Sequence, residues 1–194
     1  IEERAYSDVS LMPEGLAESL SDSELVDLLA FLSSLRQPVS IVGQYHVIGP
    51  LVDDNGTPAI DPAQKFDPNL RRQGPSGQRL SWRRLDANAE GQADLTTLIG
   101  GDSKHVAYAY VPVVSPVEQE TRLVFDTQDN LKVWLNGKPL ELPVAKDNAP
   151  RTVTVTLPRG TSELLIRVPG GPHAALVTTF AANRSLVFHT GENR

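Results

Sequence analysis

The single methionine of the chain, Met12, lies in the run S-L-M-P-E-G-L at residues 10–16, just before a segment with helical periodicity. A thioether on a short loop ahead of a terminal helix has the chemistry of an axial ligand to haem iron. The chain has no cysteine, however, so it lacks the C-x-x-C-H motif that attaches haem c covalently. We therefore expect Met12 to ligate haem only in a longer parent protein, and we expect no cofactor on this chain itself.

A second group of residues has the chemistry of a calcium site. Asp126, Asp129 and Asn130 come directly before an apolar strand-like segment. Hard carboxylate and amide oxygens at such spacing suit calcium. The alternative is a turn in which Asp and Asn side chains cap their own backbone. We favour the turn and keep calcium as the second interpretation.

Three residues could contact a carbohydrate: Trp134, Asn136 and Asp129. The flat face of an exposed tryptophan can stack on a sugar ring, while amide and carboxylate groups can bind hydroxyls. The alternative is a tryptophan packed inside the protein or beneath a loop, which its apolar neighbours favour. Trp82 has the same two interpretations. Tyr108 and Tyr110 share one strand face and need no ligand to explain them.

No catalytic constellation is recognisable in the sequence. The four histidines lie far apart, outside any zinc-binding spacing, and no nucleophile elbow or Gly-rich phosphate loop occurs. Asp53, Asp54 and Asp61 could be imagined as carboxylates for glycoside cleavage, but their polar loop predicts solvated turn residues. We therefore expect that this chain is not an enzyme, although the parent protein could be an oxidoreductase.

Composition limits the possible partners. The chain has 194 residues and a formal net charge of −6, which disfavours nucleic acid as a partner. The arginine pairs at 71–72 and 83–84 could meet an anionic ligand, but a solvated face or salt bridges to the abundant acids is the interpretation we favour. No apolar run is long enough to predict a membrane span. The first residues, Ile1-Glu2-Glu3-Arg4, lack an initiator methionine, so we expect a piece of a longer protein.

Residues 1–37 have the periodicity of two short helices. Pro13 suits the first turn of a helix that runs to about Leu20. The run S-D-S-E at 21–24 is a capping box, which predicts the start of a second helix. Leucines then recur at steps of three and four residues as far as Leu35, and Pro38 ends the segment. Their apolar stripe needs a partner outside the two helices.

From residue 38 onward the period changes to two, which predicts antiparallel strands. The expected strands are 40–48, 79–85, 105–114, 121–126, 131–135, 151–157, 163–168, 175–180 and 185–188. Asn136-Gly137 suits a tight hairpin turn, and residues 158–160 suit another. Residues 52–77 are rich in Asp, Pro, Gly and Asn and predict a long irregular excursion. We expect a mainly β protein, an antiparallel β-sandwich preceded by two short helices, with domains at 1–37 and 38–194.

The run S-L-M-P-E-G-L together with the segment L-V-D-L-L-A-F-L at 25–32 resembles the C-terminal end of class I cytochrome c domains. The resemblance is strongest to haem-binding domains of large secreted proteins in planctomycete-type bacteria. It implies that Met12 is the distal iron ligand in the parent protein and that residues 25–35 form the closing helix. It also implies electron transfer by that parent and a periplasmic or extracellular location.

A second resemblance covers about residues 40–188. V-I-G-P-L at 47–51, S-W-R at 81–83, Y-A-Y at 108–110, V-W-L-N-G-K at 133–138 and E-L-L-I-R-V at 163–168 occur in that order. This pattern resembles the galactose-binding-like jelly-roll domains appended to bacterial carbohydrate-active and cytochrome-containing proteins. It implies an accessory module that binds carbohydrate or, alternatively, only docks on neighbouring domains such as the cytochrome c domain.

Overall fold

The computed structural model describes residues 21–26, 28, 39–54, 56–100, 102–126, 130–144, 149–171, 174–182 and 186–188. The chain divides into two units, Ile1–Gln37 and Pro38–Arg194. In the first unit the predicted capping box is confirmed. The Ser21 backbone N–H donates to the Glu24 carboxylate at 2.9 Å, the Glu24 N–H donates to Ser21 Oγ at 3.4 Å, and residues 22–26 are helical. The predicted helix at 13–20 and most of the second one lie outside the described residues.

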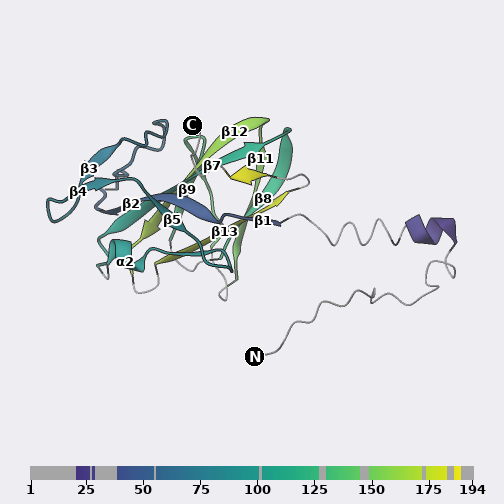
Figure 1. Cartoon of the computed structure of the whole chain (residues 1–194), viewed down its shortest axis with the longest axis horizontal. Helices are drawn as coiled ribbons and strands as arrows, with labels where there is room; N and C mark the ends of the chain where they lie inside the picture. The colour runs from purple at the N-terminus through teal and green to yellow at the C-terminus, as the bar shows by residue number, and fades with distance from the viewer. Residues whose placement is uncertain are drawn as a thin grey trace, which may run out of the picture. The chain divides into compact units, whose positions relative to one another are not determined.

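The second unit consists of antiparallel sheets in a β-sandwich-like arrangement (Figure 1). One sheet has the order β1 (Val39–Ile41), β13 (Ala175–Ala182), β8 (Gln119–Phe125), β11 (Arg151–Leu157), with β6 (Gln92–Asp94) also paired to β13. The other has the order β10 (Lys138–Leu140), β9 (Lys132–Leu135), β12 (Gly160–Pro169), β7 (Val106–Ser115), β2 (Gln44–Leu51), β5 (Arg83–Asp86), with β14 (Val187–Phe188) also paired to β7. We call these the five-stranded and the seven-stranded sheet. The prediction of a mainly β, antiparallel protein is confirmed.

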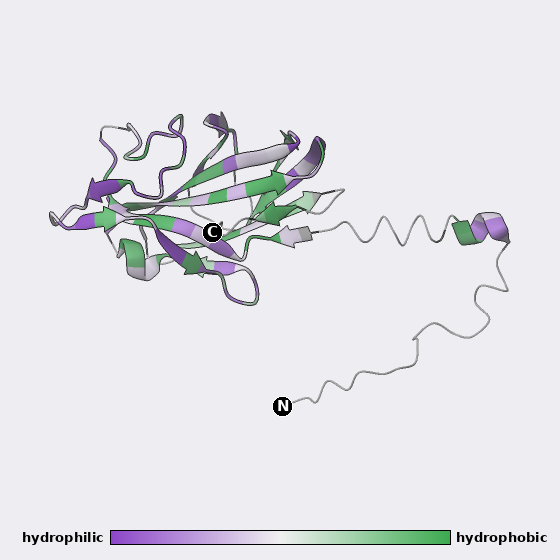
Figure 2. Cartoon of the chain, turned by 45° about the horizontal axis from the view of Figure 1, so that its top comes forward, coloured by the Kyte–Doolittle hydropathy of each residue, from purple (hydrophilic) through white to green (hydrophobic). Residues whose placement is uncertain are grey.

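The main core lies between the two sheets. Side chains at alternate positions of β7 and β12, such as Val111 and Leu164, meet side chains of the five-stranded sheet, such as Phe125 and Phe180. All four of these residues have no exposed surface. In Figure 2 hydrophobic residues gather on the strands, while hydrophilic residues gather in the connecting loops. Burial of apolar surface between the sheets is the main term that stabilises the unit.

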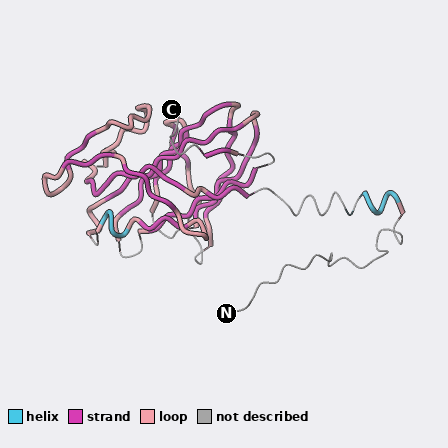
Figure 3. The backbone as a smooth tube through the Cα atoms, viewed as in Figure 1, coloured by secondary structure: helices cyan, strands magenta, loops and turns pink. Residues whose placement is uncertain are grey.

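Several predicted strands are interrupted in the structure (Figure 3). The segment predicted at 40–48 is divided between β1 and β2, because the backbone of Val42 turns aside to donate to Thr178 of β13 at 3.0 Å. The segment predicted at 79–85 is divided at Trp82 into β4 (Arg79–Ser81) and β5. The sequence analysis missed β3 (Arg71–Gln73), β6, β10 and the short helix α2 (Thr96–Ile99). Strands of three residues are too short to show a reliable period.

One predicted turn is confirmed and one is wrong. Asn136 and Gly137 join β9 to β10 with φ values of 50° and 76°, as a tight hairpin requires. A Cβ at Gly137 would also lie 3.1 Å from the carbonyl oxygen of Pro62, so this position has little room for a side chain. Residues 158–160 do not close a hairpin, since β11 and β12 belong to different sheets. A three-residue connection can carry the chain between sheets as well as reverse it within one.

The seven-stranded sheet is buried on both faces. Its outer face, which is turned away from the five-stranded sheet, carries a second apolar cluster that includes Tyr108, Tyr110, Trp134 and Leu165. Residues from the irregular excursion, among them Ile60 and Phe66, pack against this cluster. The predicted long excursion is therefore a packed cover of the sheet, followed by the hairpin of β3 and β4.

Candidate functional site

A polar clamp holds the excursion on the outer face. Asp53 accepts hydrogen bonds from the Tyr108 hydroxyl at 2.6 Å, from Arg167 Nε at 2.5 Å and from the Ala59 backbone N–H at 3.1 Å. The side chains of Asp53 and Arg167 are only 11% and 18% exposed. β7 and β12 supply the tyrosine and the arginine, while the excursion supplies the aspartate and the backbone amide.

The clamp shifts the pKa values of Asp53 and Tyr108. Burial by itself raises the pKa of the Asp53 carboxyl, but the hydrogen bonds from Tyr108, Ala59 and Arg167 outweigh burial, so the pKa falls below its ordinary value. The pKa of Tyr108 is raised, first by burial and then by the adjacent Asp53 carboxylate. Asp53 is therefore an ionised, partnered anchor, and the sequence prediction of a solvated turn residue at this position is wrong.

An aromatic cluster lies beside the clamp on the same face. Phe66 from the excursion stacks on Tyr110 from β7 with ring centroids 3.9 Å apart and planes 8° apart. The ring centroid of Trp82 lies 5.3 Å from that of Phe66, and the ring centroid of His46 lies 5.2 Å from that of Phe66. We call these four residues the outer aromatic cluster. Burial first, and then the positive charge of Arg84, lowers the pKa of His46.

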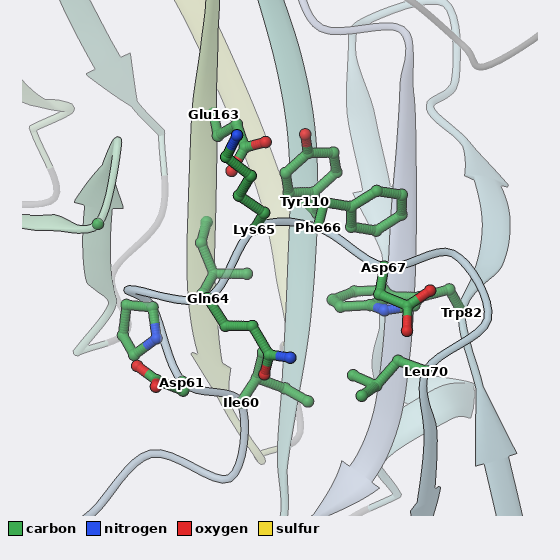
Figure 4. A pocket seen from close by; sticks show the side chains of 13 residues that line it. Ile60, Asp61, Gln64, Lys65, Phe66, Asp67, Leu70, Trp82, Tyr110 and Glu163 are labelled. Carbon is green, nitrogen blue, oxygen red and sulfur yellow. The ribbon is translucent and has the colours of Figure 1, made fainter.

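A pocket opens between this cluster, the excursion and the β9–β10 turn (Figure 4). It spans about 450 Å³ including the open space at its mouth, and about 30 Å³ of this can hold the centres of water molecules, enough for one or two waters. Its walls mix aromatic, aliphatic and charged side chains. The lining residues are Ile60, Asp61, Pro62, Gln64, Lys65, Phe66, Asp67, Leu70, Trp82, Tyr110, Gly137, Glu163 and Leu165. We call it the outer pocket.

The polar groups of the outer pocket differ in their local roles. Asp61 and Asp67 each accept a backbone N–H two residues further on, at 2.9 Å, so both stabilise turns of the excursion. Burial, followed by the charge of Glu163 and a hydrogen bond to it, raises the pKa of Tyr110. Figure 4 shows Lys65 and Glu163 pointing toward one another on one side of the pocket. Trp82 Nε1 is buried and has no hydrogen-bond partner in the described structure, so this donor is unsatisfied.

Two of the predicted carbohydrate residues serve the fold. Trp134 is only 9% exposed and belongs to the apolar cluster of the outer face. The Asn136 side chain accepts the Glu163 N–H at 2.8 Å and donates to Ser162 Oγ at 3.3 Å, which ties the β9–β10 turn to β12. Asp129, the third predicted residue, lies outside the described residues.

The predicted calcium residues are only partly described. Asp126 and Asn130 are exposed at the two ends of the 127–129 gap, and Asp129 falls inside it. Across the described part of the chain, no group of three or more His, Asp or Glu side chains is arranged to hold a metal ion. Because Asp129 is outside that part, the calcium interpretation stays a prediction.

The predicted haem ligand, Met12, also lies outside the described residues. The residues of this chain do not fit haem c, because its covalent attachment needs two cysteine thiols and the chain has none.

Most residues of the outer pocket and the clamp were not predicted from the sequence. Those singled out, but not combined into one site, were Asp53, Asp61, Trp82, Gly137 and the two tyrosines. One signal was available. The segment 105–114 is apolar or aromatic at nearly every position, and such a strand is typically buried on both faces. A second cover over one face of the sheet could have been inferred from this, and the long excursion was the segment available to form it.

Comparisons with known proteins assign no relative to this chain: no family model, no curated protein and no solved structure matches it. Among the described helices, none combines the length and the apolar character needed to cross a membrane.

Proposed function

We propose that this chain is a non-catalytic accessory domain of a larger secreted, haem-containing electron-transfer protein, and that its sandwich binds carbohydrate in the outer pocket. The galactose-binding-like jelly-roll resemblance supports the class of domain, and the cytochrome c resemblance of residues 10–35 supports the parent and a periplasmic or extracellular location. The parent's cytochrome c domain and its other domains are the proposed protein partners.

The observation that carries the carbohydrate proposal is the composition of the outer pocket. Aromatic rings of Phe66 and Trp82 lie beside carboxylate, amide and ammonium groups in one open depression. Rings of this kind bind the C–H faces of a sugar, while the polar groups bind its hydroxyls. Because only about 30 Å³ can hold the centres of water molecules, the pocket suits the end of a sugar chain rather than a whole ring enclosed on all sides.

The test is calorimetry with a panel of neutral oligosaccharides, using the whole chain and two matched variants. Trp82→Phe keeps an aromatic ring but removes part of the stacking surface, and we expect about a fivefold loss of affinity, within the range found for aromatic contacts. Trp134→Phe makes the same chemical change outside the outer pocket, and the affinity should stay within twofold of the original, about the scatter of such measurements. Absence of heat with every oligosaccharide, or an equal loss in both variants, would overturn carbohydrate binding at this pocket.

The second candidate function is a purely structural or docking domain without a ligand of its own. It is supported by the use of Trp134, Tyr108 and Asn136 in packing and in hydrogen bonds to the fold. A negative calorimetric panel would leave this function as the proposal. For the parent, a C-x-x-C-H motif encoded upstream of residue 1 would support the haem domain, and this chain purified by itself should show no Soret absorption.

A further inference from the structure

The segment from the last part of the excursion to the start of β5 has an unusual charge. Residues 70–84 contain five arginines and no acidic residue, a local charge of +5. The whole chain carries −6, so the remaining residues together carry −11. Scattered surface charge would keep the domain soluble without such a segregation of sign. The concentration of arginine in one short segment therefore calls for a local explanation.

The structure folds most of this segment into a firm hairpin. β3 and β4 pair with Arg71 opposite Ser81, Arg72 opposite Leu80 and Gln73 opposite Arg79. The connecting turn is closed by the Gly74 N–H donating to Gln78 O at 2.8 Å and the Gly77 N–H donating to Gly74 O at 2.9 Å. We call residues 71–81 the basic hairpin; Figure 1 shows it at the end of the unit that lies away from β8 and β11. Its preformed shape lowers the ordering cost of binding a ligand.

The two faces of the basic hairpin have different roles. Leu80 packs toward the outer apolar cluster, and Arg72 Nε donates to the Ala59 carbonyl at 3.4 Å, so this face attaches the hairpin to the protein. Arg71, Gln73, Arg79 and Ser81 occupy the other face, and all four are exposed. These residues line a shallow groove along the hairpin. The exposed face therefore presents two guanidinium groups, one amide and one hydroxyl.

The exposed guanidinium groups are available to an external anion. Arg71 donates only to the neighbouring carbonyls of Asn69 and Leu70 in the described structure, at 3.0 and 3.2 Å. For Arg79, no ion pair with a described carboxylate is present. The two arginines are diagonal neighbours in the register, so their Cα atoms are separated by roughly 7–8 Å. A guanidinium group matches the planar oxygens of a carboxylate or sulfate with two parallel hydrogen bonds.

We propose that the exposed face of the basic hairpin binds an acidic polysaccharide through its sulfate or carboxylate groups. The alternation of arginine with glutamine and serine fits a ligand in which anionic groups are separated by hydroxyls. Duplex nucleic acid fits less well: it carries one charge about every 1.7 Å and is bound through many phosphate contacts. Outside residues 70–84 the second unit carries a net charge of −5, which also disfavours a long rigid polyanion of that density. This site is separate from the outer pocket and does not depend on the pocket's ligand.

The test measures binding of the whole chain to four polymers at low and at moderate salt. Heparin supplies sulfate groups, polygalacturonate supplies carboxylates, dextran is neutral, and a short DNA duplex supplies phosphates. We expect binding to heparin, to polygalacturonate or to both, weakening as salt rises, and much weaker binding to dextran and DNA. Tighter binding of heparin would identify sulfate as the preferred anionic group, and tighter binding of polygalacturonate would identify carboxylate. Equal binding to DNA, or binding of the acidic polymers that does not weaken as salt rises, would overturn the proposal.

Charge-removal variants locate the site. Arg71→Gln with Arg79→Gln should weaken binding of the acidic polymer about tenfold, since each exposed ion pair is worth up to about fivefold. Lys138→Gln with Arg159→Gln removes two equally exposed charges outside the hairpin and should change affinity less than twofold. Arg79→Gln alone disturbs no hydrogen bond recorded for that side chain and should still cost about threefold. An equal loss of affinity in the Lys138 and Arg159 control would overturn the placement of the anion site on the basic hairpin. Unchanged binding of neutral oligosaccharide by the hairpin variants would show that the anion site is distinct from the outer pocket.

Discussion

The two faces of the seven-stranded sheet bury side chains by different means. The inner face meets a second sheet, and its residues form a predominantly apolar core. The outer face meets an irregular segment, and that cover is held by stacked rings and by the clamp of Asp53 on Tyr108 and Arg167. An irregular cover lacks strand-to-strand hydrogen bonds to the sheet, so specific side-chain bonds must define its position. The outer face consequently combines packing with polar groups that a ligand could use.

The largest expected difference between the two faces comes from adjacent leucines of β12. Leu164 has no exposed surface and points into the inner core, whereas Leu165 is 8% exposed and lies in the outer cluster. Leu164→Ala should lower the free energy of unfolding by about 4 kcal/mol, and Leu165→Ala by about 2 kcal/mol, because the irregular cover can relax into the space left. Urea denaturation measures both. Equal losses would show that the two covers are equally rigid.

The next largest effect should come from breaking the clamp. Asp53→Asn leaves Arg167 half-buried without its anionic partner, which should cost about 2–3 kcal/mol. Hydrogen exchange should rise in the excursion before it rises in β7 or β12. Asp126→Asn makes the same change at an exposed residue outside the clamp; it is the matched control and should change stability by less than about 0.5 kcal/mol. Unchanged exchange in the excursion of the Asp53 variant would contradict its role as an anchor.

The smallest effect concerns the titration of His46. Its pKa in the folded protein is below the ordinary value of 6.5, so the unfolded chain binds a proton more readily. The contribution of His46 to the free energy of unfolding is complete above pH 6.5, where the side chain is neutral in both states. It is lost as the pH falls through 6.5 toward the pKa of His46 in the folded protein. The difference in denaturation midpoint between pH 8 and pH 5 should therefore be smaller in His46→Gln, because the other titrating groups are common to both proteins. An unchanged difference would show that His46 is solvated in the folded state.

Features that depend on residues close together in the sequence were predicted correctly, and features that depend on residues far apart in the sequence were missed. The strand 151–157 was predicted with its observed bounds, since each of its residues alternates between core and solvent. Asn136-Gly137 was predicted as a turn because both residues accept a positive φ. The division of the strand at Trp82 was missed, because there the indole joins the outer cluster instead of continuing the sheet pattern. Carbohydrate binding was predicted at Trp134, which lines a separate depression beside β9 and β10, whereas the aromatic side chains that line the outer pocket are Phe66, Trp82 and Tyr110.

The sequence by itself determined the parts of this protein that depend on near neighbours: alternating apolar residues, Gly and Asn at turns, and the capping box at Ser21. Hydrophobic period and backbone sterics act over a few residues, so they can be recognised without a structure. Only the tertiary structure decided how the outer face is covered. Asp53 and Arg167 are 114 positions apart, and no local pattern relates them. The clamp, the outer pocket and the opposite roles of the two faces of the basic hairpin all result from such long-range packing.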